Sequence, residues 1–316
     1  MNKITIIGTG SVGSTIAYTL TYAGIASEVV LIDINTKKAL GEALDIRQGT
    51  PFCASCRVYA GSYEDAKNSN IVIITSGIAR KPGQSRLDLT RANAAILKSI
   101  IPEITKNAPD ATYILVSNPV DILTYIFCKE SGIPENRIIG SGTILDTARL
   151  RSRLSEIYNI NQQNVHAYVL GEHGDSSFVP WSVANLSCTP ILNYHNSISG
   201  GDRDLPPINT EEIEEYVRKS GAMIIEKKGA TFYAVSMQVS HICQCLTAGV
   251  DTSLTVSTML HGEYGIDDVC LSILCNIGDV GVHDKILLPL TDSEIAQLRH
   301  SAETLKDIMR QTDIVY

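Results

Sequence analysis

The sequence predicts an α/β protein in which a doubly wound parallel sheet is followed by an α+β lobe. Over the first half, short β-branched runs alternate with helical stretches, the pattern of a parallel sheet covered by helices on both faces. A glycine-rich turn links the first run to the first helical stretch. The second half differs, with short strands and polar turns such as NSISGGDRDLPPINT. We expect two lobes, residues 1–142 and 143–316, with the functional cleft between them.

The elements of the first lobe are predicted by the change between β-branched runs and apolar residues at helical spacing. Strands are expected at residues 4–7, 28–32, 57–60, 71–75, 112–116 and 137–139. Helices are expected at residues 12–23, 37–48, 88–106, 121–131 and 144–158. Strands that alternate with helices in this way pair in parallel.

The second lobe is expected to hold a strand at residues 165–170 and long amphipathic helices at 210–227 and 231–247. A last helix is expected at 292–310. It is opened by TDSE, which offers an N-cap and a carboxylate in the first turn.

The net charge and the distribution of apolar residues argue against two classes of partner, nucleic acids and membranes. The net charge of −8 and the pI near 5.4 argue against a nucleic acid partner, because such binding draws most of its affinity from a basic surface. No apolar run reaches the roughly 18 residues that a membrane helix needs, and the N-terminal residues pass directly into a strand pattern. We therefore expect a cytoplasmic protein with neither a nucleic acid nor a membrane partner.

The cysteines and histidines do not form a metal-binding pattern. Among eight cysteines, Cys53 and Cys56 make the only C-x-x-C pair, and no second pair or nearby histidine completes a zinc site. The seven histidines show no H-E-x-x-H spacing. The expectation is buried or partly buried free thiols and no metal.

The stretch ITIIGTGSVGSTIAY places Gly8, Gly10 and Gly13 in G-x-G-x-x-G between a strand and a helix. In this context the glycines permit a tight turn, close approach of a pyrophosphate and close helix packing. Asp33 ends the second strand about 20 positions later, where a carboxylate accepts hydrogen bonds from ribose hydroxyls and repels a 2′-phosphate. This favours NAD over NADP, although Lys37 and Lys38 leave some NADP tolerance open. The alternative is an ordinary turn that uses glycine for geometry alone.

Hydride transfer between nicotinamide and a hydroxyl carbon needs a group that takes or returns the hydroxyl proton. His173 in LGEHGDSS suits this role near neutral pH, on a glycine-flanked loop after an apolar strand. Arg86 lies in the basic stretch SGIARKPGQSRLDL and would polarise the substrate carbonyl. The alternative is that His173 has no catalytic role and is a loop histidine that makes a local hydrogen bond.

Asp146 and Arg149, in GSGTILDTARLR, lie three apart on one face of a helix. One interpretation is a surface ion pair of little energetic value. The other is that the two side chains diverge, so that Asp146 orients and charges the imidazole while Arg149 grips a substrate carboxylate.

Motifs along nearly the whole chain carry a family resemblance: IIGTGSVGST, KPGQSRLDL, VSNPVDILTY, GSGTILDTARLR, NVHAYVLGEHGDSS, KGATFYAVSM and LTVSTMLHGEYG. The chain resembles the NAD-dependent L-lactate dehydrogenases of bacterial type, within the lactate/malate dehydrogenase superfamily. The resemblance implies a Rossmann NAD-binding domain over 1–142 and a catalytic domain over 143–316. It also implies a small 2-oxo or 2-hydroxy acid substrate, a homotetramer, and a place in glycolysis or fermentation.

By resemblance, His173 is the proton donor and acceptor, Asp146 its partner and Arg86 the residue that polarises the carbonyl. Arg149 matches the anchor of the substrate carboxylate, and Asn118 the residue that contacts both nicotinamide and substrate. The remaining matches are a pocket wall at Thr231 and a cofactor groove at Val12, Tyr63, Gly77, Ile78, Val116 and Ser117. Lys38, which follows Asp33 closely in the sequence, is expected beside the adenosine or in solvent.

Arg151 and His166 match the pair with which many bacterial members of the family bind fructose 1,6-bisphosphate between subunits. An arginine and a histidine from neighbouring chains would form a phosphate site across an interface, so that the ligand would favour the tetramer. The alternative is that both are ordinary interface or surface residues.

Arg80 departs from the lactate pattern, since lactate dehydrogenases carry glutamine there and malate dehydrogenases arginine. Oxaloacetate has a second carboxylate whose burial demands a paired cation. The stretch GEHGDSSFVPW, the bulk of Thr231 and the pair of Arg151 and His166 favour lactate, and Arg80 could instead face solvent or Asp88. We therefore expect an L-lactate dehydrogenase, with malate or dual specificity as the alternative. The remote alternative is an NAD-binding sensor without catalytic activity. Such a protein would not need the side chains assigned to catalysis and substrate binding, yet the sequence has all four of them: Arg86, Asp146, Arg149 and His173.

Overall fold

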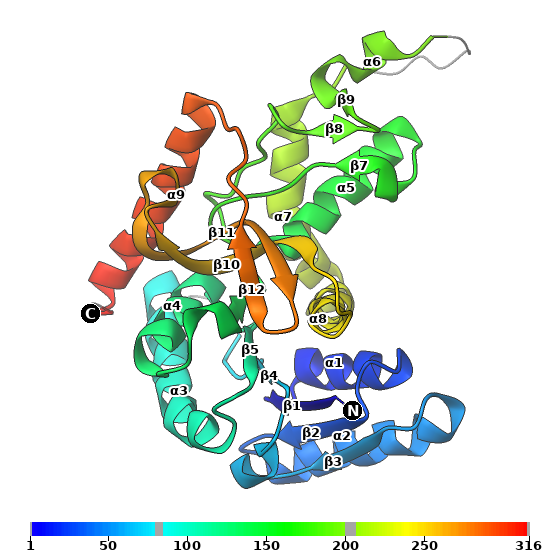
Figure 1. Ribbon diagram of the computed structural model, residues 1–316, viewed down its shortest axis with the longest axis vertical. Coiled ribbons are helices and arrows are strands. Elements are labelled where there is room, and N and C mark those ends of the chain that lie inside the picture. The colour runs from blue at the N-terminus through cyan, green and yellow to red at the C-terminus, as the bar shows by residue number, and fades with distance from the viewer. Residues whose placement is uncertain (1, 80–84, 200–206, 315–316) are drawn as a thin grey trace.

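Parallel strands of the first half form the core of one large sheet (Figure 1). The computed structural model describes residues 2–79, 85–199 and 207–314. The parallel strands are β1 Lys3–Ile7, β2 Glu28–Ile32, β3 Arg57–Ala60, β4 Ile71–Ile74, β5 Thr112–Leu115 and β6 Ile138–Gly140. Their spatial order, β6-β5-β4-β1-β2-β3, starts at the centre and proceeds outward in both directions. The predicted doubly wound parallel sheet is therefore confirmed.

The helices between these strands also lie where the periodicity places them. They are α1 Ser11–Tyr22, α2 Thr36–Gly49, α3 Arg86–Asn107, α4 Val120–Glu130 and α5 Ile144–Tyr158. In Figure 1 α3 lies beside α4, and α1 packs against α8, Tyr233–Cys245, from the second half.

The expectation of short strands in the second half is wrong for the longest of them. Strands β10 Thr252–His261, β11 Asp267–Gly278 and β12 Gly281–Lys285 form an antiparallel ribbon. This ribbon joins β6 through Ser257 and Gly140, so the main sheet has nine strands in the described chain. Serine and threonine blur the apolar signal of β10, but most of the strand is buried. The sheet thus continues past residue 142, and the domain boundary there stays a prediction.

The predicted strand at 165–170 is shorter than expected. Only β7 Val165–His166 pairs with β8 Asn185–Leu186, which continues to β9 Thr189–Pro190. The chain then leaves this small sheet, and Gly171 exchanges backbone hydrogen bonds of 3.0 and 3.1 Å with Ser272 of β11. The apolar run is therefore divided between two sheets, and this brings the following loop to the main sheet.

The remaining helices complete the second half. They are α6 Tyr194–Ser197, α7 Thr210–Lys228 and α9 Asp292–Gln311. The predicted cap of α9 is confirmed: the Thr291 hydroxyl accepts from the Glu294 amide at 3.3 Å, and Glu294 accepts from the Thr291 amide at 2.8 Å. Short 3-10 helices occupy Thr50–Phe52, Tyr63–Ala66, Glu135–Arg137, Gln162–Asn164, Ile191–Asn193 and Glu263–Gly265.

All eight cysteines are free thiols. Cys188 is exposed, against the expectation of buried or partly buried thiols, because it lies in the tight turn between β8 and β9 with φ of 66°. Within the described ranges, no group of three or more His, Cys, Asp or Glu side chains is placed to hold a metal ion. No helix in those ranges is both long and apolar enough to cross a membrane.

Candidate active site

The glycine loop between β1 and α1 has the shape that a pyrophosphate requires. Gly8 has φ of 100°, and a Cβ on it would lie 2.8 Å from the Ser76 amide nitrogen. A Cβ on Gly13 would collide with the Gly8 carbonyl, whereas one on Gly10 would meet nothing within 4 Å. The first turn of α1 also has no acidic residue and no capping side chain. The amides at the start of α1 therefore face open space beside Gly10, which fits an anionic ligand.

Asp33 stabilises this loop from the end of β2. Its Oδ2 accepts from the Thr9 amide at 2.6 Å and the Thr9 hydroxyl at 3.0 Å, and its Oδ1 accepts from the Asn35 amide at 2.8 Å. Burial opposes the charge, but these hydrogen bonds and nearby Lys38 outweigh it and hold the pKa of Asp33 below its ordinary value. The carboxylate is thus ionised at the edge of the predicted cofactor groove.

The ends of β4 and β5 carry further predicted groove residues side by side. The Ser117 hydroxyl donates to the Ser76 carbonyl at 2.6 Å. Asn93 of α3 accepts from the Ile78 amide at 2.8 Å and donates to the Asn118 carbonyl at 2.7 Å. Asn93 was not predicted, although a buried amide on the apolar face of a helix is a signal that sequence offers. Two loops are thereby fixed at the carboxyl edge of the sheet, where such sheets bind their ligands.

The other groove positions lie near this edge or on its approaches. Val12 and Tyr63 are partly buried against the core, and Val116 follows β5. Gly77 and Ile78 are exposed, and Ile78 retains 42% of its accessible surface.

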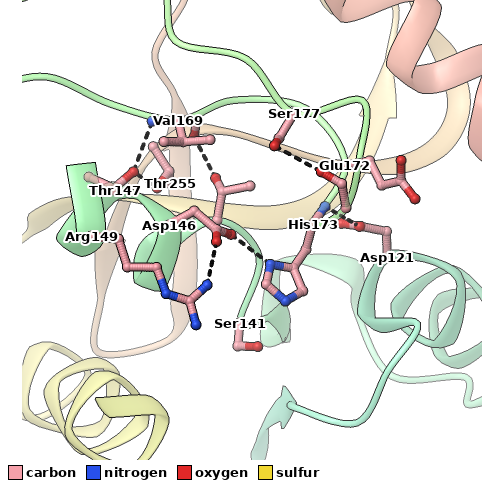
Figure 2. A network of polar contacts seen from close by, with 12 residues as sticks. Asp121, Ser141, Asp146, Thr147, Arg149, Val169, Glu172, His173, Ser177 and Thr255 are labelled. Atoms are coloured by element: carbon pink, nitrogen blue, oxygen red, sulfur yellow. Dashed lines mark hydrogen bonds and ion pairs between the residues drawn. The ribbon is translucent and has the colours of Figure 1, made fainter. Parts of the chain in front are cut away.

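Asp146 connects the two side chains that the sequence assigns to chemistry (Figure 2). Its Oδ2 lies 2.6 Å from Nδ1 of His173, and its Oδ1 accepts from Nη1 of Arg149 at 2.8 Å. The expected divergence of Asp146 and Arg149 is therefore wrong, because one carboxylate holds both partners. The pair is not a surface ion pair either, since only 8% of the Asp146 side chain and 15% of the Arg149 side chain is exposed.

The contacts between His173, Asp146 and Arg149, the triad of this site, set the protonation of its members. The Asp146 charge raises the pKa of His173, against the opposing effect of burial. Burial likewise opposes the charge on Asp146, but His173 and Arg149 outweigh it, so the pKa of Asp146 lies below its ordinary value. Asp146 thus stays ionised and favours the imidazolium form of His173.

Arg86 reaches the loop that carries His173. It is the first residue of α3, and its guanidinium pairs with the carboxylate of Glu172, which is 1% exposed. Nη1 of Arg86 also lies 3.8 Å from Asp175. The Ser176 hydroxyl donates to the second oxygen of Glu172 at 2.5 Å. Glu172 was not predicted, and its only signal was an acid directly before His173.

Arg149 and Thr231 line the same cavity, of about 440 Å³. Leu145 and Phe232 supply apolar walls. Lys227 and Lys228 also line it. A pocket with a partly buried guanidinium, two lysines and mostly apolar walls suits a small organic anion.

Sequence comparison matches both halves of the chain to one family. The description "lactate/malate dehydrogenase, NAD binding domain" covers residues 2–140, and "lactate/malate dehydrogenase, alpha/beta C-terminal domain" covers residues 143–313. The chain belongs to the lactate/malate dehydrogenase family. The Rossmann fold and NAD as cofactor, both predicted from the glycine loop and Asp33, are confirmed.

The similar proteins within this family are named as lactate dehydrogenases. The L-lactate dehydrogenase of Thermoanaerobacter sp. (strain X514) is 47% identical, with 99% of this chain and 100% of the relative aligned. That of Acetivibrio thermocellus is 45% identical, with 99% and 98% aligned. A crystal structure of a lactate dehydrogenase from a Medee basin deep-sea metagenome library has a TM-score of 0.94 and 37% identity, with 99% of each chain covered. The crystal structure of the minor L-lactate dehydrogenase of Enterococcus mundtii, in a ligands-bound form, has a TM-score of 0.92 and 37% sequence identity, and the match covers 98% of each chain.

The predicted effector pair, Arg151 and His166, lies away from the triad, and the predicted specificity residue Arg80 lies outside the described residues. Arg151 donates to the Ala167 carbonyl at 3.1 Å and lies over the Tyr168 ring at 5.1 Å, beside a cavity of about 290 Å³. His166 is exposed on β7. Arg80, on which the malate alternative depends, lies outside the described residues.

Proposed function

We propose that this protein is an NAD-dependent L-lactate dehydrogenase that interconverts pyruvate and L-lactate. The observation that carries the proposal is the bridging carboxylate of Asp146, which holds a proton donor and an anion-binding guanidinium at fixed positions. A 2-oxo acid presents the matching groups, since its carbonyl oxygen needs a proton and its carboxylate needs a cation.

In the reduction, Arg149 binds the pyruvate carboxylate and His173 gives its Nε2 proton to the carbonyl oxygen. Bound NADH supplies the hydride, and the glycine loop with Asp33 and Asn118 holds the cofactor. Asp146 keeps the imidazole oriented and charged before the transfer. Arg86 approaches the same loop through Glu172, and its role is to polarise the carbonyl.

Steady-state kinetics with NADH and either pyruvate or oxaloacetate test this assignment. We expect kcat/KM for pyruvate to exceed that for oxaloacetate by at least about tenfold, because the relatives that align over the whole chain are L-lactate dehydrogenases and the side chain of Thr231 takes up space in the cavity that a longer substrate would need. A preference for oxaloacetate by orders of magnitude would instead support malate dehydrogenase. No oxidation of NADH with any of a panel of 2-oxo acids would support the idle sensor.

Malate or dual specificity is the second candidate, on the strength of Arg80 in the sequence. If Arg80 pairs with a second substrate carboxylate, Arg80→Gln lowers oxaloacetate turnover much more than pyruvate turnover, because the mismatched charge loses its partner. Equal losses with both substrates would show that Arg80 makes no such contact. The two kcat/KM values of each variant are the measurement.

We further propose a homotetramer activated by fructose 1,6-bisphosphate at Arg151 and His166. The exposure of His166 and the cavity beside Arg151 support an anion site at a subunit face. The effector is expected to lower KM for pyruvate and to stabilise the tetramer, and Arg151→Gln with His166→Gln to abolish both responses. Kinetics and sedimentation with and without the effector are the measurements, and an unchanged response in the double variant would exclude this site.

We also propose that the protein works in the cytoplasm, where NAD-dependent metabolism takes place and thiols stay reduced. The eight free cysteines support this, because a reducing compartment preserves them.

A further inference from the structure

Two threonine hydroxyls of the α5 region, those of Thr143 and Thr147, hold the segment that leads to His173, and we call this pair the threonine clamp. The Thr147 hydroxyl accepts from the Val169 amide at 2.9 Å (Figure 2), and the Thr143 hydroxyl donates to the Val169 carbonyl at 2.5 Å. All three residues are buried. Strand β7 ends at His166, so Val169 lies beyond it and bonds to side chains rather than to a strand.

The simplest explanation of the threonine clamp is that it satisfies a buried peptide, which would otherwise lose its hydrogen bonds to water. The position of Thr143 points to more than this. It is the N-cap residue of α5, where a threonine hydroxyl ordinarily accepts from an amide of its own helix. No such bond is present, and the hydroxyl donates to a residue 26 positions later in the chain. The start of α5 therefore has a contact with the catalytic segment in place of a side-chain cap.

Thr147 is also fixed from the main sheet. Its hydroxyl oxygen lies 3.1 Å from the hydroxyl oxygen of Thr255 in β10, and Thr255 is buried. Because the Thr147 oxygen accepts from the Val169 amide, its own proton is available to Thr255. Helix α5, strand β10 and the catalytic segment thus meet at one buried hydroxyl.

Asp146 lies between the two threonines in the sequence, and its Oδ2 is 2.6 Å from Nδ1 of His173. The threonine clamp and this contact close a ring that runs from α5 through Val169 to His173 and back to α5. Asp121 of α4 holds His173 at another point, by accepting from its backbone amide at 2.8 Å. The clamp sets where the segment lies along α5, so a displaced Val169 would change the distance between the imidazole and the carboxylate.

We propose that Thr143 and Thr147 are positioning residues that set the contact between His173 and Asp146 by holding the backbone of Val169. This inference rests on the proposed function, since it assigns His173 to proton transfer. Asp146 stabilises the charged imidazole only while the two groups stay in contact. A loosened clamp therefore slows proton transfer and reduces the fraction of protonated His173, whereas the glycine loop that binds NADH is unchanged.

Pairs of variants separate each hydroxyl from the rest of its side chain. Thr143→Val and Thr147→Val remove the hydroxyl and keep the volume, whereas Thr143→Ser and Thr147→Ser keep the hydroxyl. We expect each valine variant to lower kcat for pyruvate by about tenfold, since misplacement by 1 Å can cost roughly 10²-fold, with the Kd for NADH unchanged. The serine variants should retain most of the wild-type rate. Serine variants as slow as the valine variants would overturn the proposal, and each position tests it if the other valine variant does not fold.

Thr312→Val is the matched control for the loss of a buried hydroxyl. Thr312 is buried at the end of α9, and its hydroxyl donates to the Ile308 carbonyl of the same helix at 2.7 Å. This variant should keep the wild-type kcat, while its thermal midpoint reports the cost of losing such a hydroxyl. Losses of kcat in the clamp variants no larger than in Thr312→Val would refute the positioning role.

The pH profile separates positioning from a loss of stability. Among the charged groups around the His173 ring, Asp146 raises its pKa most, against burial, while Asp121 also raises it and Arg149 lowers it. Pyruvate reduction needs the protonated imidazole, so activity is lost as pH rises through this pKa. A weaker contact with Asp146 lowers the pKa, so the descending limb of kcat/KM should move to lower pH in the valine variants of the clamp. An unmoved limb in folded valine variants would overturn the proposal.

A measurement without substrate tests the contact itself. In the free protein, NMR of labelled histidine rings follows the titration of His173, whose signal is assigned by its loss in His173→Gln. The signal should titrate at lower pH in the valine variants of the clamp than in the wild type and in Thr312→Val. Equal titration in all of them would refute the positioning role. If the signal shifts as described but the wild type never oxidises NADH with pyruvate, only the proposed function fails.

Discussion

Asp146→Asn is expected to lower kcat/KM for pyruvate by about 10³-fold, the range that loss of effective general acid catalysis produces. Asp146 contacts His173 and Arg149 at once, with distances of 2.6 and 2.8 Å. An asparagine has one carbonyl oxygen for two donors, and its NH₂ group must face one of them. Either the imidazole or the guanidinium therefore loses its acceptor in a site where both partners are largely buried.

The same substitution should change the pH dependence in a defined direction. The charge of Asp146 raises the pKa of His173, so its removal lowers that pKa. Pyruvate reduction needs the protonated imidazole, so activity is present below the pKa of His173 and lost above it. The descending limb of kcat/KM against pH should therefore move to lower pH in Asp146→Asn. An unmoved limb with a reduced rate would mean that Asp146 acts on position alone.

Local signals in the sequence were sufficient for much of the fold. Helix α5 is found at the residues that its periodicity predicts, and the start of α9 follows from the capping residues Thr291 and Glu294. Both depend on residues within a few positions of each other. The strand at 165–170 was predicted by its apolar content alone and is found only at Val165–His166, because the chain after it moves from one sheet to another.

The residues of the site also fall into those that the sequence predicts and those that only the tertiary structure reveals. The motifs bring His173, Asp146 and Arg149 to attention, and the structure places all three in contact. The partners that complete the site, Glu172 for Arg86 and Asp121 for His173, are 86 and 52 residues away from them in the chain. Only the packing of α3 and α4 against the catalytic loop creates these contacts. A carboxylate at either position looks like a surface residue in the sequence.

Arg149→Lys is expected to raise KM for pyruvate strongly and to lower kcat/KM by about 10²-fold or more, because a charge-assisted bidentate contact becomes a single point contact. Lysine keeps the positive charge, so the result separates the shape of the guanidinium from its charge. The shorter ammonium head also leaves Oδ1 of Asp146 without its partner at 2.8 Å. The Kd for NADH should stay near that of the wild type, since the cofactor groove lies at the glycine loop and the strand ends.

Arg153→Lys is the matched control for Arg149→Lys. Arg153 lies on the same helix, is partly exposed, and pairs with Glu156 at 3.4 Å and with Glu212 at 3.9 Å, and such pairs near solvent contribute little. Its guanidinium also lies 5.1 Å from the centre of the Tyr216 ring, and a lysine there keeps a positive charge near the ring. Its kcat/KM should stay within about twofold of wild type. A loss in Arg149→Lys no larger than in this control would show that no substrate carboxylate reaches Arg149. A loss in kcat alone, at unchanged KM, would place the contribution of Arg149 in the transition state rather than in substrate binding, because uniform binding lowers KM without raising kcat.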